Sequence, residues 1–204
     1  MKNFYTEKLV EIWQKSVHLY ESGHKNSKSF PIDEDLPFLE ELGMNKMDIF
    51  DFAEDWLCEG EPDLPTFLLI HEQRRDYFWE VQKKVASTER LDSSTLPPKD
   101  SDINGIRWLP RIIPKAKGKL RGELPPETMF CCGGDRNFFH QNNIHPSEFL
   151  GVVRRSENDD QKIIDWVLKR AKAKRRCATG LNTICHWFIW IMPCINYRVS
   201  CPGV

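Results

Sequence analysis

The stretch that decides the fold runs from residue 105 to residue 166 and begins with GIRWLPRIIPKAKGKLRG at residues 105–122. A second segment, MFCCGGDRNFF, occupies residues 129–139, and a third, IHPSEF, occupies residues 144–149. Pro110 suits the first turn of a helix, because the missing N–H costs little there. Pro114 lies one turn later, so we predict that this helix either begins at Pro114 or bends there. Gly122 is expected to end it.

Polar residues mark three further helix starts after this basic segment. We predict that Asp135 caps a helix over residues 136–141. His145 or Ser147 is expected near the cap of the next helix, and residues 158–160 are expected to open the last one.

The chain before residue 105 also shows helical periodicity. Its first apolar stripe consists of Leu9, Ile12, Trp13, Val17 and Tyr20, at spacings of three and four. Three further helices are predicted, separated at Gly43 and at residues 60–62, with the last reaching Val85. Because no strand-like alternation is visible, the predicted fold class is all-α: a compact bundle of about six to eight short helices with little or no sheet.

The composition divides the chain into four regions. Residues 1–86 form an N-terminal helical half, 87–103 a polar, proline-containing linker, and 104–175 a helical domain that we expect to pack with the N-terminal half as one unit. The atypical tail, residues 176–204, holds four of the seven cysteines and a Trp-rich apolar run. That run is shorter than the ~20 residues that span a bilayer. Two interpretations stay open: an unstructured tail that was not selected for folding, or an interfacial anchor with a basic flank.

Charge and cysteine usage limit the function classes. The 204 residues carry a formal net charge of −1, which gives no overall attraction to nucleic acid or to anionic membranes. No apolar leader is visible and few cysteines precede residue 177, so we expect a cytoplasmic protein. Residues 33–63 are strongly acidic, whereas residues 107–121 contain bases and no acid. The two regions could pair internally, form solvated surfaces or face partners.

The basic helix is the first candidate site. Arg111, Lys115 and Lys119 recur every four residues and can share one face, as expected for a site that holds an anionic small molecule or an acidic protein surface. The alternative is a solvated or internally paired helix. No aromatic residues alternate with these bases, so nucleic acid is not an expected partner.

The Cys132–Asp135 turn is the second candidate. A turn that opens a helix exposes backbone N–H groups, which can hold an anion or activate a thiol. Cys132 is therefore the candidate nucleophile, with His140 or His145 as its base; the alternative is a purely structural turn. Cys131 and Cys132 are adjacent, whereas structural zinc sites usually place two to four residues between cysteines, so no metal or cofactor is expected. Around His71, the polar residues 72–76 form either a solvated face or a pocket lining.

These segments resemble the DUF5069 family, a bacterial domain family of unknown function. The resemblance rests on Gly105, Leu109, Pro110, Arg111, Lys115, Ala116, Lys119, Gly122, Asp135, Phe138, Ile144, Phe149, Asp160 and Trp166. It is specific over residues 104–170 and stops before Cys177, and it departs from the family pattern at Gly133 and Gly134. The resemblance implies a small, mainly helical, soluble bacterial domain. The family pattern shares the polar residues Arg111, Lys115 and Asp135. The resemblance implies no activity, because none is established for the family.

Two functional hypotheses follow. The first is a binding or interaction module that holds an anionic ligand or acidic partner; its predicted ligand-binding residues are Arg111, Lys115, Lys119 and Asp135. The second is a small enzyme that uses Cys132 as nucleophile. The first hypothesis depends on the basic segment presenting its charges outward.

Overall fold

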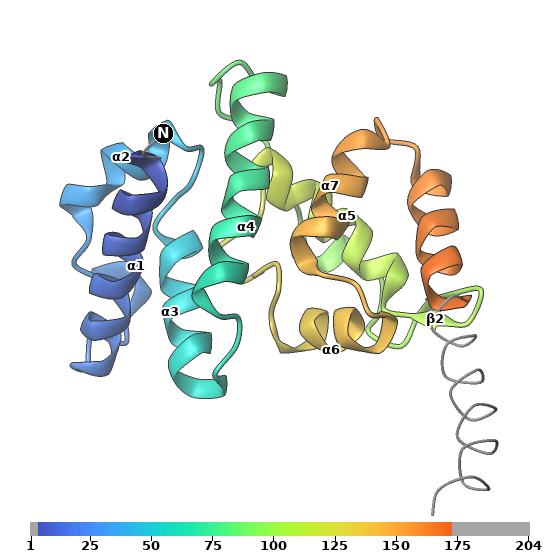
Figure 1. Cartoon of the computed structure of the whole chain (residues 1–204), viewed down its shortest axis with the longest axis horizontal. Helices are drawn as coiled ribbons and strands as arrows, with labels where there is room; N and C mark the ends of the chain where they lie inside the picture. Colours follow the sequence, from blue (N-terminus) through green and yellow to red (C-terminus); the bar gives the residue numbers. More distant parts are fainter. Residues whose placement is uncertain (1–3, 173–204) are drawn as a thin grey trace, which may run out of the picture.

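The computed structural model describes residues 4–172 and is built almost entirely from helices (Figure 1). The helices are α1 (Phe4–Glu21), α2 (Leu36–Glu41), α3 (Met47–Glu59), α4 (Leu64–Asp76), α5 (Leu109–Arg121), α6 (Gly133–Asn142), α7 (Pro146–Arg155) and a last helix over residues 160–172. Short helical turns are η1 (Ser27–Ser29), η2 (Asp33–Asp35), η3 (Tyr77–Val81) and η4 (Ser93–Thr95). The all-α prediction is confirmed. No helix within residues 4–172 combines the length and the apolar character needed to cross a membrane.

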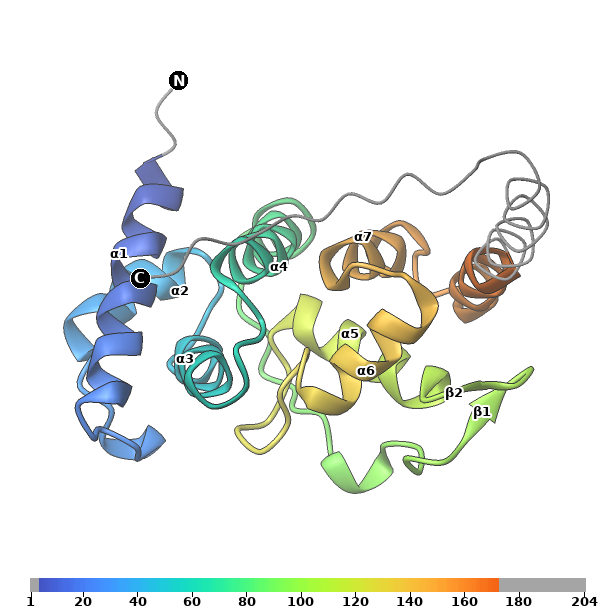
Figure 2. The same ribbon diagram turned by 60° about the horizontal axis from the view of Figure 1, so that its bottom comes forward.

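The helices form two groups that meet at α4. Figure 1 shows α1, α2 and α3 at one end, α5, α6, α7 and the last helix at the other, and α4 between them. One continuous cluster of buried apolar side chains includes Ile12 of α1, Ile70 of α4 and Leu150 of α7. Two antiparallel strands of two residues each, β1 (Asp102–Ile103) and β2 (Ile106–Arg107), precede α5 (Figure 2).

Side chains next to the breaks predicted at Gly43 and at residues 60–62 bond the backbone at the start of the following helices. Asn45 accepts a hydrogen bond from Met47 N at 2.8 Å, and Asp63 accepts one from Thr66 N at 3.0 Å. Gly122 ends α5 in the left-handed conformation, with φ at 71°. Helix α5 passes through Pro114, so the alternative in which it begins there is wrong.

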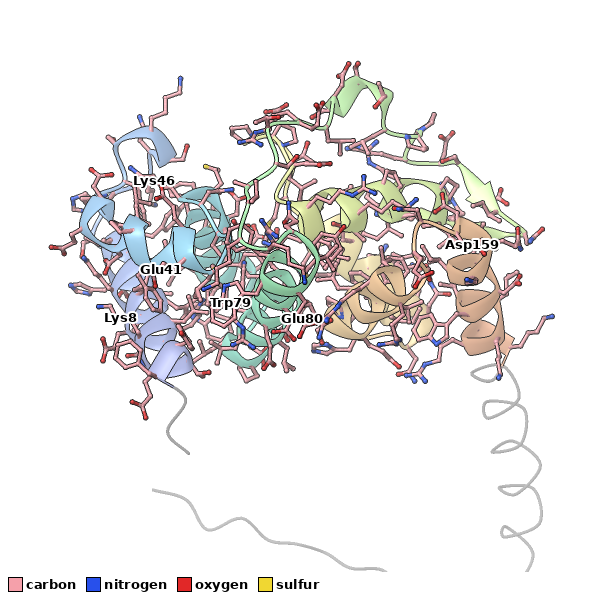
Figure 3. All side chains as sticks on the ribbon, turned by 90° about the horizontal axis from the view of Figure 1, so that it is seen from above. Lys8, Glu41, Lys46, Trp79, Glu80 and Asp159 are labelled. Atoms are coloured by element: carbon pink, nitrogen blue, oxygen red, sulfur yellow. The ribbon has the colours of Figure 1, made fainter. Side chains whose placement is uncertain are left out.

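Two local predictions need correction. Asp135 is not the N-cap of α6, because that helix begins at Gly133 and Cys132 occupies the cap; the Asp135 side chain accepts instead from Cys131 N, at 2.9 Å. The helix predicted to reach Val85 ends earlier, because α4 passes into the π-helical turn η3. Figure 3 shows the side chains of Trp79 and Glu80 on different sides of the η3 ribbon. Trp79 Nε1 donates to Glu41 O at 2.7 Å, whereas Glu80 pairs with Arg154 of α7.

The region predicted as a linker packs against the connection between α5 and α6. Leu91 N donates to Glu123 O at 2.8 Å, and the Ser93 and Thr128 hydroxyls lie 2.8 Å apart. The chain therefore follows the surface of the C-terminal helices before β1 begins.

Arg74 of α4 joins three segments in the interior. Arg74 is 3% exposed, and its guanidinium donates to Gly43 O at 2.8 Å, to Leu120 O at 2.8 Å and to Gln82 Oε1 at 2.6 Å. Burial lowers the pKa of Arg74 to about 10. A Cβ at Gly122 would lie 2.6 Å from Arg74 Nη2, so the turn that ends α5 must be glycine both for its φ and for this contact.

Candidate functional site

Lys115 of α5 lies in a buried polar centre around Asp135. Its Nζ donates to Asp135 Oδ2 at 2.5 Å, and the two side chains are 4% and 0% exposed. Trp108 Nε1 donates to Asp135 Oδ1 at 2.8 Å. With the bond from Cys131 N, the carboxylate accepts three hydrogen bonds without water. A buried ion pair needs such additional donors to offset the desolvation of both charges.

The packing of Trp108 against this centre explains one of the two consecutive glycines. A Cβ at Gly134 would lie 2.5 Å from Trp108 Cζ2, whereas the nearest atom to a Cβ at Gly133 would be Glu59 Oε2 at 3.4 Å. Both residues lie in the first turn of α6, so neither provides a flexible loop.

We expect alanine to lower the free energy of unfolding at Gly134 but not at Gly133. Gly134→Ala forces the indole of Trp108 to move and should lower the free energy of unfolding by about 1–3 kcal/mol. Gly133→Ala, the matched control, should be neutral or raise it by up to about 1 kcal/mol, because alanine favours the helix. Urea unfolding monitored by circular dichroism measures both changes, and equal stabilisation of both variants would contradict this packing.

Lys119, one turn after Lys115, forms a second buried bridge. It is 4% exposed and pairs with Asp48 of α3, and its Nζ lies 2.9 Å from Nε2 of His71 on α4. His71 Nδ1 lies 2.8 Å from Phe67 O and therefore donates to it, which leaves Nε2 as the acceptor for the ammonium group. Burial, and secondarily the charge of Lys119, lower the pKa of His71 to about 4, so this imidazole is neutral near pH 7.

A second carboxyl on α3, Asp51, lies beside this bridge. Burial raises the pKa of Asp51 to about 7, and the charge of Asp48 adds to that effect. Asp48 and Asp51 share the lining of a cavity of about 20 Å³ with Lys119. A cavity of that size holds about one water molecule and no substrate.

The raised pKa predicts a specific pH dependence of stability. Because the folded pKa of Asp51 lies above the unfolded value of 3.8, its stabilising contribution is complete below pH 4 and is lost as the pH rises to about 7. Asp51→Asn should therefore be more stable than the parent by about 2 kcal/mol at pH 8, allowing for partial solvent access, and equally stable near pH 4. Unfolding measured at both pH values tests this. The control is Asp100→Asn, which removes an exposed carboxylate; a pH-independent gain for Asp51→Asn would contradict the prediction.

The remaining bases of α5 make other contacts. Arg111 Nη1 donates to Pro97 O at 2.7 Å, and Lys117 pairs with Asp160 at 2.5 Å. The expectation that the segment presents its charges outward is wrong for Lys115 and Lys119, because they lie on the same face as the buried Ile112 and Ala116. The predicted ligand-binding role of Arg111, Lys115, Lys119 and Asp135 stays a prediction, and for both lysines it requires a buried ion pair to open.

Cys132 and the two histidines predicted beside it lie in different surroundings. Cys132 is partly buried, and its Sγ lies 3.4 Å from Lys115 Nζ. His140 and His145 line a cleft with Cys131, whose thiol is fully buried. Burial, and secondarily the Asp135 carboxylate, raise the pKa of Cys131, so its thiol is a poor nucleophile. Within residues 4–172, no three histidine, cysteine or carboxylate side chains come together as ligands for a metal ion.

The hollow lined by Cys131, His140 and His145 has a volume of about 250 Å³ and is called the cleft from here on. One wall is the connection from α3 to α4, and the other is α6 with the turn into α7. Its lining consists of Gly60, Glu61, Pro62, Asp63, Thr66, Cys131, Arg136, Phe139, His140, Ile144, His145 and Pro146. The cleft therefore lies where the N-terminal half meets the C-terminal helices, a common position for a ligand pocket.

Arg136 lines the cleft and makes several polar contacts there. Its Nη1 donates to Asp55 Oδ2 at 2.6 Å and to Cys131 O at 2.8 Å, its Nη2 pairs with Glu59, and its Nε lies 3.6 Å from Glu61 Oε2. Three carboxylates of the acidic region thus meet one guanidinium. Internal pairing of the acidic region was one of the alternatives that the sequence left open, but Arg136 lies outside the basic segment, residues 107–121.

His145 caps α7 at the mouth of the cleft. Ser147 N donates to its Nδ1 at 3.3 Å, so Nδ1 is an acceptor and the proton of the neutral ring lies on Nε2. Nε2 is 3.4 Å from the Thr66 hydroxyl across the cleft. The sequence placed His145 or Ser147 near the cap of this helix but gave no signal that Thr66 would face His145.

A second hollow, of about 450 Å³, lies beside α1 and α4. His71, Glu72 and Arg75 line it together with apolar residues. The pocket-lining alternative for this polar cluster therefore holds for these three residues. Arg74, in contrast, is buried between α4 and the end of α5.

Comparisons with known proteins place part of this architecture in a family. Residues 96–185 match the family described as Domain of unknown function (DUF5069). No curated protein and no solved structure matches the chain. The match begins inside the predicted linker and extends past Cys177, so the expectation that the resemblance ends before Cys177 is wrong. It includes one wall of the cleft, whereas residues 60–66 of the other wall precede it. Residues 96–185 are therefore assigned to a DUF5069 domain, which spans less than half of the chain.

Proposed function

We propose that the protein is a binding module and that the cleft is its ligand site. The observation that supports this is the combination of a buried apolar wall with a few converging polar groups in one hollow. Pro62, Phe139 and Ile144 form the apolar wall, while Thr66 and His145 contribute polar atoms at the mouth. Small-molecule sites have this composition and occur at junctions between structural units.

This proposal keeps the binding class inferred from the sequence and moves the site. Lys115 and Lys119 already contact carboxylates in the interior, and an anion could reach them only by displacing Asp135 or Asp48. Removing one partner of a buried ion pair costs several kcal/mol, about 3–5. The cleft is already open and needs no such rearrangement.

Histidine resonances provide a direct test. The ¹³C-labelled imidazoles are observed by NMR at constant pH while three probes of equal length are added: pentylamine, pentan-1-ol and pentanoate. We expect at least one probe to shift the resonances of His140 and His145 with a saturating dependence on concentration. His18 and His24, exposed on or next to α1, are the internal controls. If all three probes leave His140 and His145 unmoved, or move the controls equally, the cleft is not a ligand site.

The alternative is a small enzyme that uses Cys132. The contact between Lys115 Nζ and Cys132 Sγ at the start of α6 favours it, because a nearby ammonium group is a common feature of reactive cysteines. Iodoacetamide labelling at pH 7, followed by peptide mapping, compares Cys132 with the exposed Cys58. We expect Cys132 to react no faster than Cys58. A much faster reaction at Cys132 would favour the enzyme.

A further inference from the structure

We propose that the cleft selects a ligand with a primary ammonium group on a short apolar stem. This inference rests on the proposed function, because it specifies the ligand class of the same site. The sequence pointed to an anionic ligand, and the geometry of the cleft points to the opposite charge.

The first argument is the balance of charge around the cleft. Among its described lining residues, Glu61 and Asp63 are acidic and Arg136 is the cation. Arg136 is already matched by Asp55, Glu59 and Glu61, so three carboxylates surround one guanidinium. An anionic ligand would meet this surplus of negative charge, whereas a cation would be stabilised by it.

The second argument is the use of donors. A guanidinium carries five N–H groups. In Arg136, Nη1 contacts Asp55 and the Cys131 carbonyl, Nη2 contacts Glu59, and Nε faces Glu61. Three of the five N–H groups are therefore used within the protein and the Nε group faces a carboxylate, so an anionic ligand would have to compete with Glu59 and Glu61 for this guanidinium.

The third argument is the supply of acceptors. The side chain of Glu61 is 49% exposed; its Oε2 lies 3.6 Å from Arg136 Nε and its Oε1 3.7 Å from His140 Nε2, both beyond hydrogen-bond distance. Asp63 Oδ1 accepts from Thr66 N and so caps α4, whereas its Oδ2 accepts no hydrogen bond from residues 4–172. An ammonium group carries three donors and no acceptor, which matches these carboxylate oxygens.

The fourth argument is the shape of the apolar wall. Pro62, Phe139, Ile144 and Pro146 are buried and line the cleft. At about 250 Å³ the cleft is smaller than the ~300–1,000 Å³ of pockets for drug-sized molecules. A stem of a few methylene groups could bury its surface there while the ammonium group stays near the acidic mouth.

The three probes of equal length separate the ligand class from the existence of the site. We expect pentylamine to bind more tightly than pentan-1-ol and pentanoate, and to bind less tightly in 0.5 M NaCl because salt screens the partly exposed carboxylates. Tighter binding of pentanoate would overturn the ligand class and leave the binding module intact. Failure of all three probes would overturn both.

Two conservative variants test the residues. Glu61→Gln and Asp63→Asn keep size and hydrogen-bonding capacity, and asparagine still caps a helix. Each should weaken pentylamine binding by about three- to tenfold, the effect of losing one partly solvated charge-assisted contact. Glu41→Gln, which removes an exposed carboxylate on α2, should leave the affinity unchanged. Unchanged affinity in both cleft variants would overturn the assignment.

A fourth probe distinguishes the source of the ammonium group. Nα-acetyl-lysine methylamide presents the same amine on a peptide backbone. Binding as tight as that of pentylamine points to a lysine side chain of a polypeptide. Binding of pentylamine alone points to a free amine, and either result supports the ligand class.

Discussion

Replacing Asp135 by alanine is expected to lower the free energy of unfolding by about 3–5 kcal/mol, the cost of leaving one partner of a buried ion pair uncompensated. The ammonium group of Lys115 would stay in an interior site where its side chain is 4% exposed. The N–H groups of Cys131 and Trp108 would also lose their acceptor. Urea unfolding monitored by circular dichroism gives the change directly.

The matching experiment removes the other partner. Lys115→Met leaves Asp135 with two hydrogen-bond donors, so we expect a smaller loss than for Asp135→Ala. The double variant Lys115→Met/Asp135→Ala contains neither charge and should be more stable than the sum of its single variants implies. Strict additivity would show that the two side chains do not interact in solution.

Arg74→Met is expected to cost about 3 kcal/mol, because it leaves buried acceptors without donors. The carbonyl oxygens of Gly43 and Leu120 both receive hydrogen bonds from this guanidinium. Methionine fills similar volume, so the loss reports mainly the hydrogen bonds. For a chain of this length, ~3 kcal/mol corresponds to a fall in Tm of roughly 6–12 °C.

The neighbouring arginine is the control. Arg75 lies on the same helix, but its partners Glu72 and Asp76 are partly exposed. Exposed ion pairs contribute about 0–1 kcal/mol, so Arg75→Met should change Tm by no more than a few degrees. Similar losses for the two variants would contradict the role of Arg74 as a buried connection between segments.

The sequence predicted the helices well because their signals are local. The apolar stripe of α1 and the end of α5 at Gly122 depend on residues within one or two turns. Whether the lysines of α5 face the interior or the solvent is not decided by neighbouring residues in the sequence. A spacing of four residues shows that Lys115 and Lys119 share a face, but not that the face is internal. The partner of Lys119, Asp48, lies 71 residues away.

The candidate site was predictable only in fragments. His140 and His145 were named as bases for Cys132, and the fold brings them instead into one cleft with Cys131. Arg136 gave no separate signal, because a single arginine after an aspartate is common on any helix. Gly134 stood out in the sequence only as a departure from the family pattern. Its lack of a Cβ makes room for the ring of Trp108, a contact that follows only from packing.

The contacts of Lys119 with Asp48 and His71 connect the region that matches the family to the helices that precede it. The matched region begins at residue 96, so the carboxylate and imidazole that neutralise and solvate this ammonium group both belong to the preceding helices. An excised fragment starting near residue 96 would expose a cationic, partly apolar surface in place of an interior. In this chain, the N-terminal helices therefore supply both groups that surround the Lys119 ammonium group in the interior.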